Sequence, residues 1–420
     1  MADRTVTRRR SKGAPARGSH LRLVRTEERL RPAPGATAVA RRNLTLLLVP
    51  TALLTVVGLV MILSAGSISA VEGYGTSFWY FNRQTLYAVA GVAGLVVSAR
   101  VPYLFWRRAA IPLLLLVLPL MLLTLHPTVG SSLYGASRWI DLGPITLQPA
   151  EFAKLLTIGS AAAILSRPWK NLARFRDAFL PLGPVVLVVA GIVLLQRDLG
   201  TTLIICGSVF LLLFAAGLRV RHLAWTAVGG AGAIAYFIFG TAYRRTRFLE
   251  AWLRWEQDPS GAGWQLRQGL IALGSGGWFG VGLGNSRQKW DYLPNAHSDF
   301  VFAVLGEELG LFGAIAILSL FAMLLFAGVR IAMNAQDMFG RLLAIGITGW
   351  IGLQTLMNLG AVTGLLPITG VPLPFLSFGG TALVVTLAGV GVVASVALDG
   401  VRPMERRRAR SRSAGRGSRR

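Results

Sequence analysis

The sequence predicts an all-α polytopic membrane protein with about ten transmembrane helices. Of its 420 residues, 53% are hydrophobic, and the mean hydropathy is +0.57. The apolar residues fall into runs of about 17–25, the length that a helix needs to cross a hydrocarbon core of about 30 Å. Inside such a core each segment must satisfy its own backbone polar groups, which favours helices. This composition excludes a soluble enzyme.

The expected spans follow the apolar runs in order. They are 43–65, 81–99, 109–126, 149–166, 180–196, 199–218, 223–241, 300–329, 341–360 and 379–398. Their orientation follows from the short loops that keep Lys and Arg, because basic loops stay in the cytoplasm. The basic residues of the predicted inner loops are Arg107, Arg108, Arg167, Lys170, Arg174, Arg176, Arg219, Arg221, Arg330 and Arg341. We therefore expect both termini inside (N-in, C-in) and a large extracytoplasmic loop, 242–299, between helices 7 and 8.

Two basic tails flank the predicted membrane domain, 43–400. Residues 1–42 and 401–420 are rich in Arg, Ser, Gly, Pro and Ala and carry most of the net charge of +25. Such a composition predicts disordered cytoplasmic tails. Their arginine runs could contact nucleic acid or anionic membrane lipids. Attraction to lipid is the favoured interpretation, and no nucleic-acid partner is expected.

Three outer segments differ from plain connectors, namely 127–148, 242–299 and 361–378. The second is rich in Trp, which indicates amphipathic stretches at the membrane interface rather than disorder. The third is dense in Gly and Pro. Because long loops in compact proteins are usually functional, we expect the functional residues at the outer face.

Ionisable residues in or beside a span are candidate site residues, because burying one in the bilayer costs at least about 2.5–3.5 kcal/mol. Glu151 and Lys154 are three residues apart and share a helix face. They could serve a site or form an ion pair that anchors the helix. Asp198 lies in the short turn between 180–196 and 199–218, where it could serve a site or simply be exposed.

Asp299 is the expected catalytic residue. It stands at the start of the eighth span, where a helix would place it on one stripe with the small residues Ala303, Gly306 and Gly310. Such a stripe lets a neighbouring helix approach closely. A carboxylate at its rim would be partly desolvated, which suits it to general-base work.

Other polar residues surround this candidate in the sequence. Glu307 and Glu308, about 12 Å deeper along a helix, are expected to be buried and paired. His297 beside Asp299 suggests a metal ligand only weakly, so a divalent cation (Mg²⁺ or Mn²⁺) stays an alternative and no other cofactor is expected. The long outer loop also carries basic residues, which could bind phosphate or simply form a solvated edge at the membrane interface. They are Arg244, Arg245, Arg247, Arg267, Arg287 and Lys289.

Four longer stretches resemble signatures of the SEDS family, the shape, elongation, division and sporulation proteins. They are SRWIDLGPITLQPAEFAKL (137–155), QRDLGTTL (196–203), GLGNSRQKWDYLPNAHSDFVFAVLGEELG (282–310) and LPITGVPLPFLSFGG (366–380). The stretches keep the order of the family, and the resemblance covers roughly 43–400. The third stretch is more similar to the division branch than to the elongation branch, which leaves an elongation role as an alternative.

The resemblance implies a peptidoglycan glycosyltransferase that polymerises lipid II at the outer leaflet of the bacterial cytoplasmic membrane. It implies Asp299 as the essential acidic residue. The expected substrate-binding residues are Arg138, Trp139, Glu151, Lys154, Asp198, Gln265, Gln268, Lys289, His297 and Ser377. One departure is that the family usually has proline at the position of Arg197, so the shape of the turn before Asp198 stays open.

In the expected reaction, Asp299 deprotonates the 4-hydroxyl of the acceptor GlcNAc, which attacks the anomeric carbon of the donor MurNAc. Undecaprenyl diphosphate leaves, and outer Arg and Lys or a divalent cation would stabilise its charge. The implied partners are the growing glycan strand, a class B penicillin-binding protein transpeptidase, and other division or elongation proteins. A lipid II flippase and a non-catalytic scaffold are the alternatives. The gathering of candidates at the outer face favours the enzyme.

Overall fold

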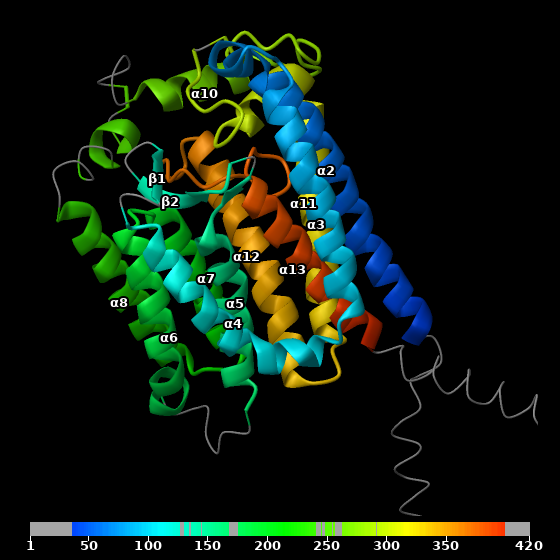
Figure 1. Cartoon of the computed structure of the whole chain (residues 1–420), viewed down its shortest axis with the longest axis vertical. Coiled ribbons are helices and arrows are strands. Elements are labelled where there is room, and N and C mark those ends of the chain that lie inside the picture. Colours follow the sequence, from blue (N-terminus) through cyan, green and yellow to red (C-terminus); the bar gives the residue numbers. More distant parts are fainter. Residues whose placement is uncertain are drawn as a thin grey trace, which may run out of the picture.

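The computed structural model describes residues 36–126, 130–133, 136–143, 145–167, 175–240, 245, 248–253, 255–256, 263–290 and 292–399. In these residues long helices stand side by side in one bundle (Figure 1). The predicted tails lie outside the described residues, except that the first helix already begins at Ala36.

The helices of the bundle overlap every predicted span. The first six are α2 (Ala36–Tyr74), α3 (Trp79–Arg100), α4 (Tyr103–Leu123), α5 (Pro149–Leu165), α6 (Phe175–Leu195) and α7 (Leu199–Ala215). The others are α8 (Val220–Phe239), α11 (Val301–Met333), α12 (Met338–Val362) and α13 (Gly380–Asp399). By length and apolar composition, 6 helices of the described chain could cross a membrane: α2, α4, α8, α11, α12 and α13. The helical prediction is therefore confirmed, whereas the number of spans stays a prediction.

A small antiparallel sheet and short helical pieces lie at one end of the bundle, the upper end in Figure 1. The strands pair in the order β1 (Gly130–Leu133), β2 (Ala136–Asp141) and β3 (Thr146–Leu147). The helical pieces are the π-helix η1 (Leu249–Leu253) and α10 (Trp264–Ser275). The sheet is an exception to the predicted all-α fold. A tight turn makes it possible, because Asp141 accepts a 2.9 Å hydrogen bond from the backbone of Gly143, which has φ 84°.

The most buried helix is α5, in which every residue except Phe152 is buried. It packs against α4, α7 and α12. Small residues such as Gly159 and Ala161 allow these close approaches. By contrast α8 lies at the edge of the bundle, with only Leu223 and Ile238 buried. The core therefore surrounds α5, and α8 covers one side of it.

Gly310 divides α11 into two segments. Its φ of 68° and ψ of −167° are not helical, and a Cβ at this position would overlap the backbone of Phe279 and Gly280. Asp299 lies in a turn before α11, because the helix begins only at Val301. The prediction of a continuous helical stripe from Asp299 to Gly310 is therefore wrong. The close contact with the loop of Gly280 requires the glycine and bends the chain.

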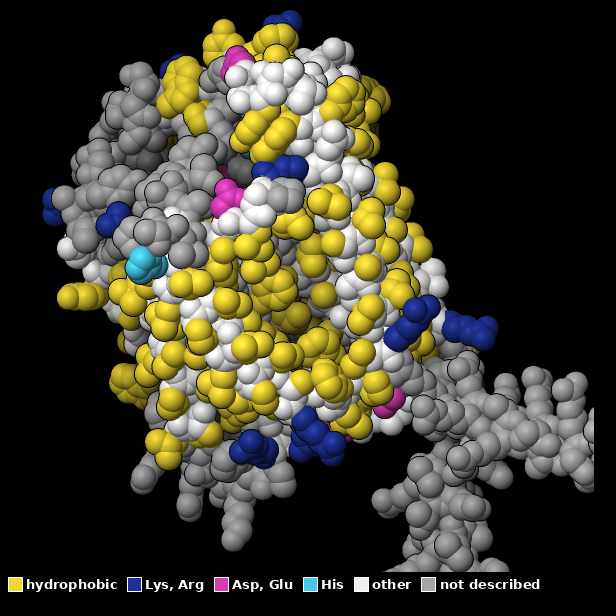
Figure 2. All heavy atoms as spheres, in the orientation of Figure 1, with side chains coloured by type: hydrophobic (Ala, Val, Ile, Leu, Met, Phe, Trp, Pro, Cys, Tyr) yellow, Lys and Arg dark blue, Asp and Glu magenta, His cyan; other side chains and the backbone are white. Residues whose placement is uncertain are grey.

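The flank of the bundle is apolar. Figure 2 shows hydrophobic side chains over the sides of the helices, while charged side chains gather toward the two ends. Large apolar side chains are exposed on this flank, among them Leu180 at 72%, Leu187 at 74% and Tyr236 at 82%. An apolar surface of this extent requires a lipid environment. The chain is an integral membrane protein.

Candidate active site

The loop between α12 and α13, residues 363–379, holds the turn that carries Asp299. The backbone N–H of Phe378 donates to the carbonyl of His297 (2.9 Å). The Ser377 hydroxyl donates to the carbonyl of Ser298 (2.6 Å) and accepts from the N–H of Leu373 (2.8 Å). Ser377 is therefore a buried residue whose hydroxyl connects the loop to the turn by hydrogen bonds.

Asn358 on α12 binds both the turn that carries Asp299 and the α12–α13 loop. Its amide nitrogen donates to the carbonyl of Asp299 and to that of Val371, each at 2.8 Å. The side chain is 2% exposed, and its Oδ1 atom finds no hydrogen-bond partner in the described chain. We did not predict this residue. A polar amide inside the apolar run 341–360 was the signal that could have identified it.

The carboxylate of Asp299 faces the same loop. Asp299 is partly buried, and a Cβ on Gly370 would lie 3.5 Å from its Oδ2 atom. Gly370 has φ 69°, a conformation that favours glycine. The carboxylate of Asp299 thus lies beside the α12–α13 loop.

His297 belongs to an aromatic group beside this turn. Its ring centroid lies 4.3 Å from that of Tyr80 and 5.9 Å from that of Phe378. Burial lowers the pKa of His297 to about 4, so the imidazole is neutral at pH 7. The described residues contain no group of three or more His, Cys, Asp or Glu side chains that could hold a metal ion.

A second group forms where α6 runs into α7. Arg138, positioned by β2, lies 3.4 Å from a carboxylate oxygen of Asp198 and donates to the carbonyl of Arg197 (3.1 Å). Asp198 also caps α7, accepting from the N–H and the hydroxyl of Thr201, both at 2.9 Å. Asp198 is 3% exposed, so the alternative of a merely exposed residue is wrong. The Trp139 ring lies 5.9 Å from the Arg138 guanidinium.

The turn before Asp198 has a definite shape. Arg197 has φ 61°. Its backbone N–H donates to the carbonyl of Leu194 (3.0 Å), and the N–H of Asp198 donates to the carbonyl of Val193 (3.1 Å). This bonding is the Schellman end of a helix. Proline has a fixed negative φ and no N–H, so it could not form this turn.

Glu151 and Lys154 form an internal ion pair at 2.8 Å, each 2% exposed. Lys154 also donates to the side-chain oxygen of Gln354 (3.2 Å), which accepts from Trp350 as well (2.8 Å). The Gln354 amide nitrogen in turn donates to the carbonyl of Pro372 (2.9 Å). The predicted ion pair is confirmed, and it too is connected to the α12–α13 loop. A role in substrate binding stays a prediction.

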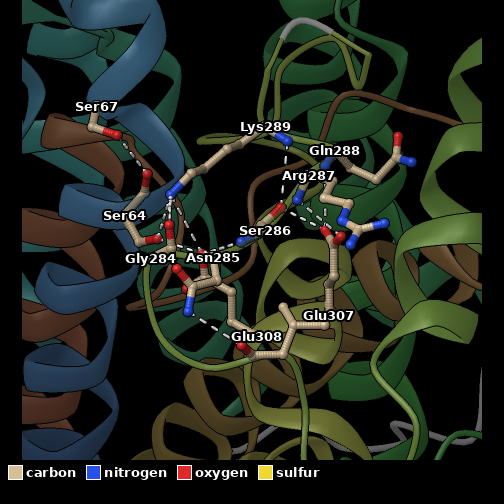
Figure 3. A network of polar contacts seen from close by, with 11 residues as sticks. Ser64, Ser67, Gly284, Asn285, Ser286, Arg287, Gln288, Lys289, Glu307 and Glu308 are labelled. Atoms are coloured by element: carbon tan, nitrogen blue, oxygen red, sulfur yellow. Dashed lines mark hydrogen bonds and ion pairs between the residues drawn. The ribbon is translucent and has the colours of Figure 1, made fainter.

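Lys289, Glu307 and Glu308 share a third network (Figure 3). The Lys289 ammonium lies 3.7 Å from Glu308, and Ser64 on α2 donates to the same carboxylate oxygen at 2.5 Å. Glu307 accepts from the Ser286 hydroxyl (2.5 Å). Both glutamates are almost completely buried, so the prediction that they are buried and paired is confirmed. The ammonium of Lys289, predicted to bind substrate, lies inside this network.

The remaining predicted residues, Gln265 and Gln268, lie on α10. Gln265 donates to the carbonyl of Pro294 (3.2 Å), five residues before Asp299, and Gln268 is buried. α10 packs against α11. Gln265 therefore supports the segment that leads to Asp299.

An apolar groove of about 1260 Å³ runs beside the site. Its walls come from α6, α7, α8, α12 and residues 366–369 of the α12–α13 loop. The lining includes Phe179 near one end of α6 and Arg197 just beyond the other end. Arg138 and Arg197 are the charged members of the described lining. The groove thus has a long apolar part and a cationic end, and Thr369 joins that end to Gly370 beside Asp299.

These features define a class of protein: an integral membrane protein whose buried polar groups meet around one loop, beside a groove shaped for an amphiphile. The family model of FtsW, RodA and SpoVE proteins, described as "Cell cycle protein", matches residues 44–400. The chain belongs to this family.

Named relatives agree over most of the chain. "Probable peptidoglycan glycosyltransferase FtsW" of Geobacter metallireducens is 42% identical over 358 residues, covering 85% of this chain and 95% of the relative. "Stage V sporulation protein E" of Bacillus subtilis is 40% identical over 351 residues, covering 84% and 96%. In a solved peptidoglycan synthase complex, one chain superposes with a TM-score of 0.70 at 30% identity, covering 84% and 97%. The Thermus thermophilus rod shape determining protein RodA superposes with a TM-score of 0.62 at 31% identity, covering 84% and 96%.

Proposed function

We propose that this protein is a peptidoglycan glycosyltransferase that polymerises lipid II into glycan strands at the outer face of the bacterial cytoplasmic membrane, for septal synthesis in cell division. The observation that carries the proposal is a partly buried aspartate, Asp299, beside an apolar groove with a cationic end. Asn358 of α12 holds the backbone carbonyl of Asp299, and the α12–α13 loop holds the turn before it. The names of the relatives support the same activity and the division role.

The groove suits a lipid-linked sugar. Its apolar walls would accept a polyprenyl tail, and Arg138 and Arg197 would lie near the diphosphate. The sugars would then project past Thr369 and Gly370 toward Asp299. The reacting bond would then lie where the tail leaves the membrane.

In the proposed reaction Asp299 accepts the proton of the 4-hydroxyl of the acceptor GlcNAc. The oxygen forms a bond to the anomeric carbon of MurNAc, the bond from that carbon to the diphosphate oxygen breaks, and undecaprenyl diphosphate leaves with the electron pair. A single displacement inverts the anomeric centre. In this proposal outer arginines stabilise the charge of the leaving diphosphate, and a divalent cation is the alternative.

The proposed topology has about ten spans with both termini inside. The polar end of the bundle would face outward, with segment 242–299 lying over it. Basic residues at the opposite helix ends support this orientation, for example Arg107 and Arg219. The solved synthase complex, which coordinates polymerisation and crosslinking, supports a class B penicillin-binding protein transpeptidase as the partner.

The test is glycan-chain formation from purified lipid II by the wild type and Asp299→Asn, each with its cognate transpeptidase. Asn keeps the size of Asp but cannot accept the proton. We expect polymer from the wild type and a loss of at least about 100-fold in the variant, the usual contribution of a general base. Equal polymer from both would remove Asp299 from the chemistry. No polymer from a folded wild-type complex would favour the flippase or the scaffold.

A further inference from the structure

The ammonium of Lys289 is bound by three parts of the protein at once. It donates to the carbonyl of Gly284 (2.5 Å) and to the hydroxyl of Ser64 on α2 (3.4 Å). It also lies 3.7 Å from Glu308 on α11, and the Ser64 hydroxyl donates to the same carboxylate oxygen (Figure 3). Lys289 is 6% exposed, and Glu308 is 0% exposed. The charge of Lys289 is therefore directed into the protein.

The neighbouring carboxylate, Glu307, holds the backbone of the same segment. It accepts from the hydroxyl of Ser286 and from the backbone N–H groups of the next two residues, at 2.5 Å, 3.0 Å and 3.4 Å. The N–H of Ser286 donates to Glu308 (3.3 Å). Two adjacent residues of α11 thus hold both the backbone beside Lys289 and its ammonium, at the beginning of the segment that leads to Asp299.

Contacts continue along this segment toward the turn before α11. The N–H of Leu293 donates to the carbonyl of Gln288 (3.0 Å). At the far end, α2 approaches again, because a Cβ on Gly66 would lie 3.5 Å from the Cβ of His297. The segment 284–299 is thus bound near its beginning by α11 and Ser64, and near its end it packs against α2.

The charges of this network make it sensitive to the loss of one member. It contains two buried carboxylates and one ammonium, and the Oε2 atom of Glu308 finds no hydrogen-bond partner in the described chain. Removal of the Lys289 ammonium would leave Glu308 buried without its ion pair. An unpaired buried charge is strongly unfavourable, so the surrounding groups would rearrange, and the segment that leads to Asp299 would move with them.

We infer that Lys289, together with Glu308 and Ser64, positions the segment that carries Asp299 and does not bind the substrate itself. This inference rests on the proposed function, because Lys289 would act through the catalytic carboxylate. It assigns a role to a buried network that the proposed reaction does not use.

The test compares the wild type with Lys289→Met and Glu308→Gln, each in nanodiscs with its transpeptidase partner. Both changes remove a charge and nearly preserve the length of the side chain. Polymerisation of lipid II gives kcat and KM, and binding of fluorescent lipid II gives Kd. We expect kcat to fall about 10- to 100-fold in each variant, because a displacement of about 1 Å at the reacting groups costs up to this much. Kd should stay within about twofold.

Comparing the two variants separates positioning from substrate binding. If Lys289 bound the substrate, Kd would rise in Lys289→Met, whereas Glu308→Gln would release the ammonium and leave Kd equal or lower. That pattern would overturn the inference. If the two residues act as one positioning unit, the double variant should lose no more kcat than the poorer single variant. Additive losses in the double variant would contradict this.

Ser64→Ala and Ser67→Ala form a matched pair on neighbouring turns of α2. The Ser67 hydroxyl donates to the carbonyl of Ser64 within the helix (2.9 Å), so its removal should leave kcat within about twofold. Ser64→Ala removes a donor to Glu308 and should lower kcat about two- to tenfold. Equal kcat in the two variants would exclude Ser64 from the positioning unit.

Hydrogen–deuterium exchange provides a readout that does not depend on activity. Peptides covering 284–300 should exchange faster in Lys289→Met than in the wild type, whereas peptides of α8 should be unchanged. Unchanged exchange in 284–300 would overturn the inference, and so would a lowered thermal midpoint with normal kcat, which indicates a structural role only. If the wild type forms no polymer and the exchange difference persists, the proposed function fails and the positioning of the segment stands.

Discussion

At the scale of single residues, the structure assigns positions that explain how Asp299 is held. Asn358 uses both amide hydrogens, one on Asp299 and one on Val371. An oxygen cannot replace this nitrogen, because both partners are acceptors. The orientation of the amide therefore follows from its surroundings, and its two donors bind the turn of Asp299 and the α12–α13 loop.

We predict that Asn358→Asp lowers kcat about tenfold or more with KM nearly unchanged, because a small displacement of a catalytic group is costly. Steady-state polymerisation of lipid II by folded, monodisperse protein measures this. Thr355→Val is the matched control. That residue lies on the same helix, and its hydroxyl donates to the carbonyl of Ile351 in its own turn (2.8 Å). A fall in yield and thermal midpoint with normal kcat in Asn358→Asp would show a structural role only.

The lowered pKa of His297 leads us to expect that the stability of the protein depends on pH. Its pKa falls from 6.5 to about 4 on folding, so between these values the unfolded chain binds more protons. The stability contributed by neutral His297 is complete above pH 6.5 and is lost as pH falls toward 4. The thermal midpoint of His297→Gln in detergent should therefore fall less steeply than that of the wild type between pH 6.5 and 4. Parallel curves would contradict this assignment.

At the scale of elements, the division of α11 at Gly310 separates a short segment that begins beside Asp299 from a long apolar helix. The short segment is enclosed by neighbouring loops. A Cβ on Gly276 would overlap the backbone of Gly306, and one on Gly280 would overlap that of Glu308. Glu307 and Glu308 anchor the end of the segment to Ser286 and Ser64. The turn before α11 is thus held from both sides.

Gly310→Ala should lower stability by more than about 1–3 kcal/mol, the cost of a backbone region that essentially only glycine occupies, because the overlap with Gly280 adds to it. The shift of the thermal midpoint measures the effect. Gly229→Ala on α8 is the control, since nothing lies within 4 Å of its added Cβ. Equal midpoints for the two variants would mean that the bend at Gly310 does not need glycine.

At the scale of the whole molecule, the α12–α13 loop joins groups that lie far apart in the chain. Ser377 reaches the turn of Asp299, Pro372 accepts from Gln354 of the Lys154 network, and Thr369 lines the groove. Near Asp198, a Cβ on Gly200 would meet Val371 and Thr369. A single loop therefore contacts all three groups.

The sequence by itself determined the membrane class, the helices and the family, because apolar runs and motifs are local properties of the chain. It also indicated the pairing of Glu151 with Lys154, which are one turn apart, whereas the catalytic role of Asp299 stays a prediction. Only the tertiary structure decided the ion pair of Arg138 with Asp198, the two bonds of Asn358 and the bend at Gly310. These features depend on contacts between segments that are distant in the sequence. The helical spacing that suggested a stripe from Asp299 carries no information about such contacts, so it could not predict where the backbone leaves the helix.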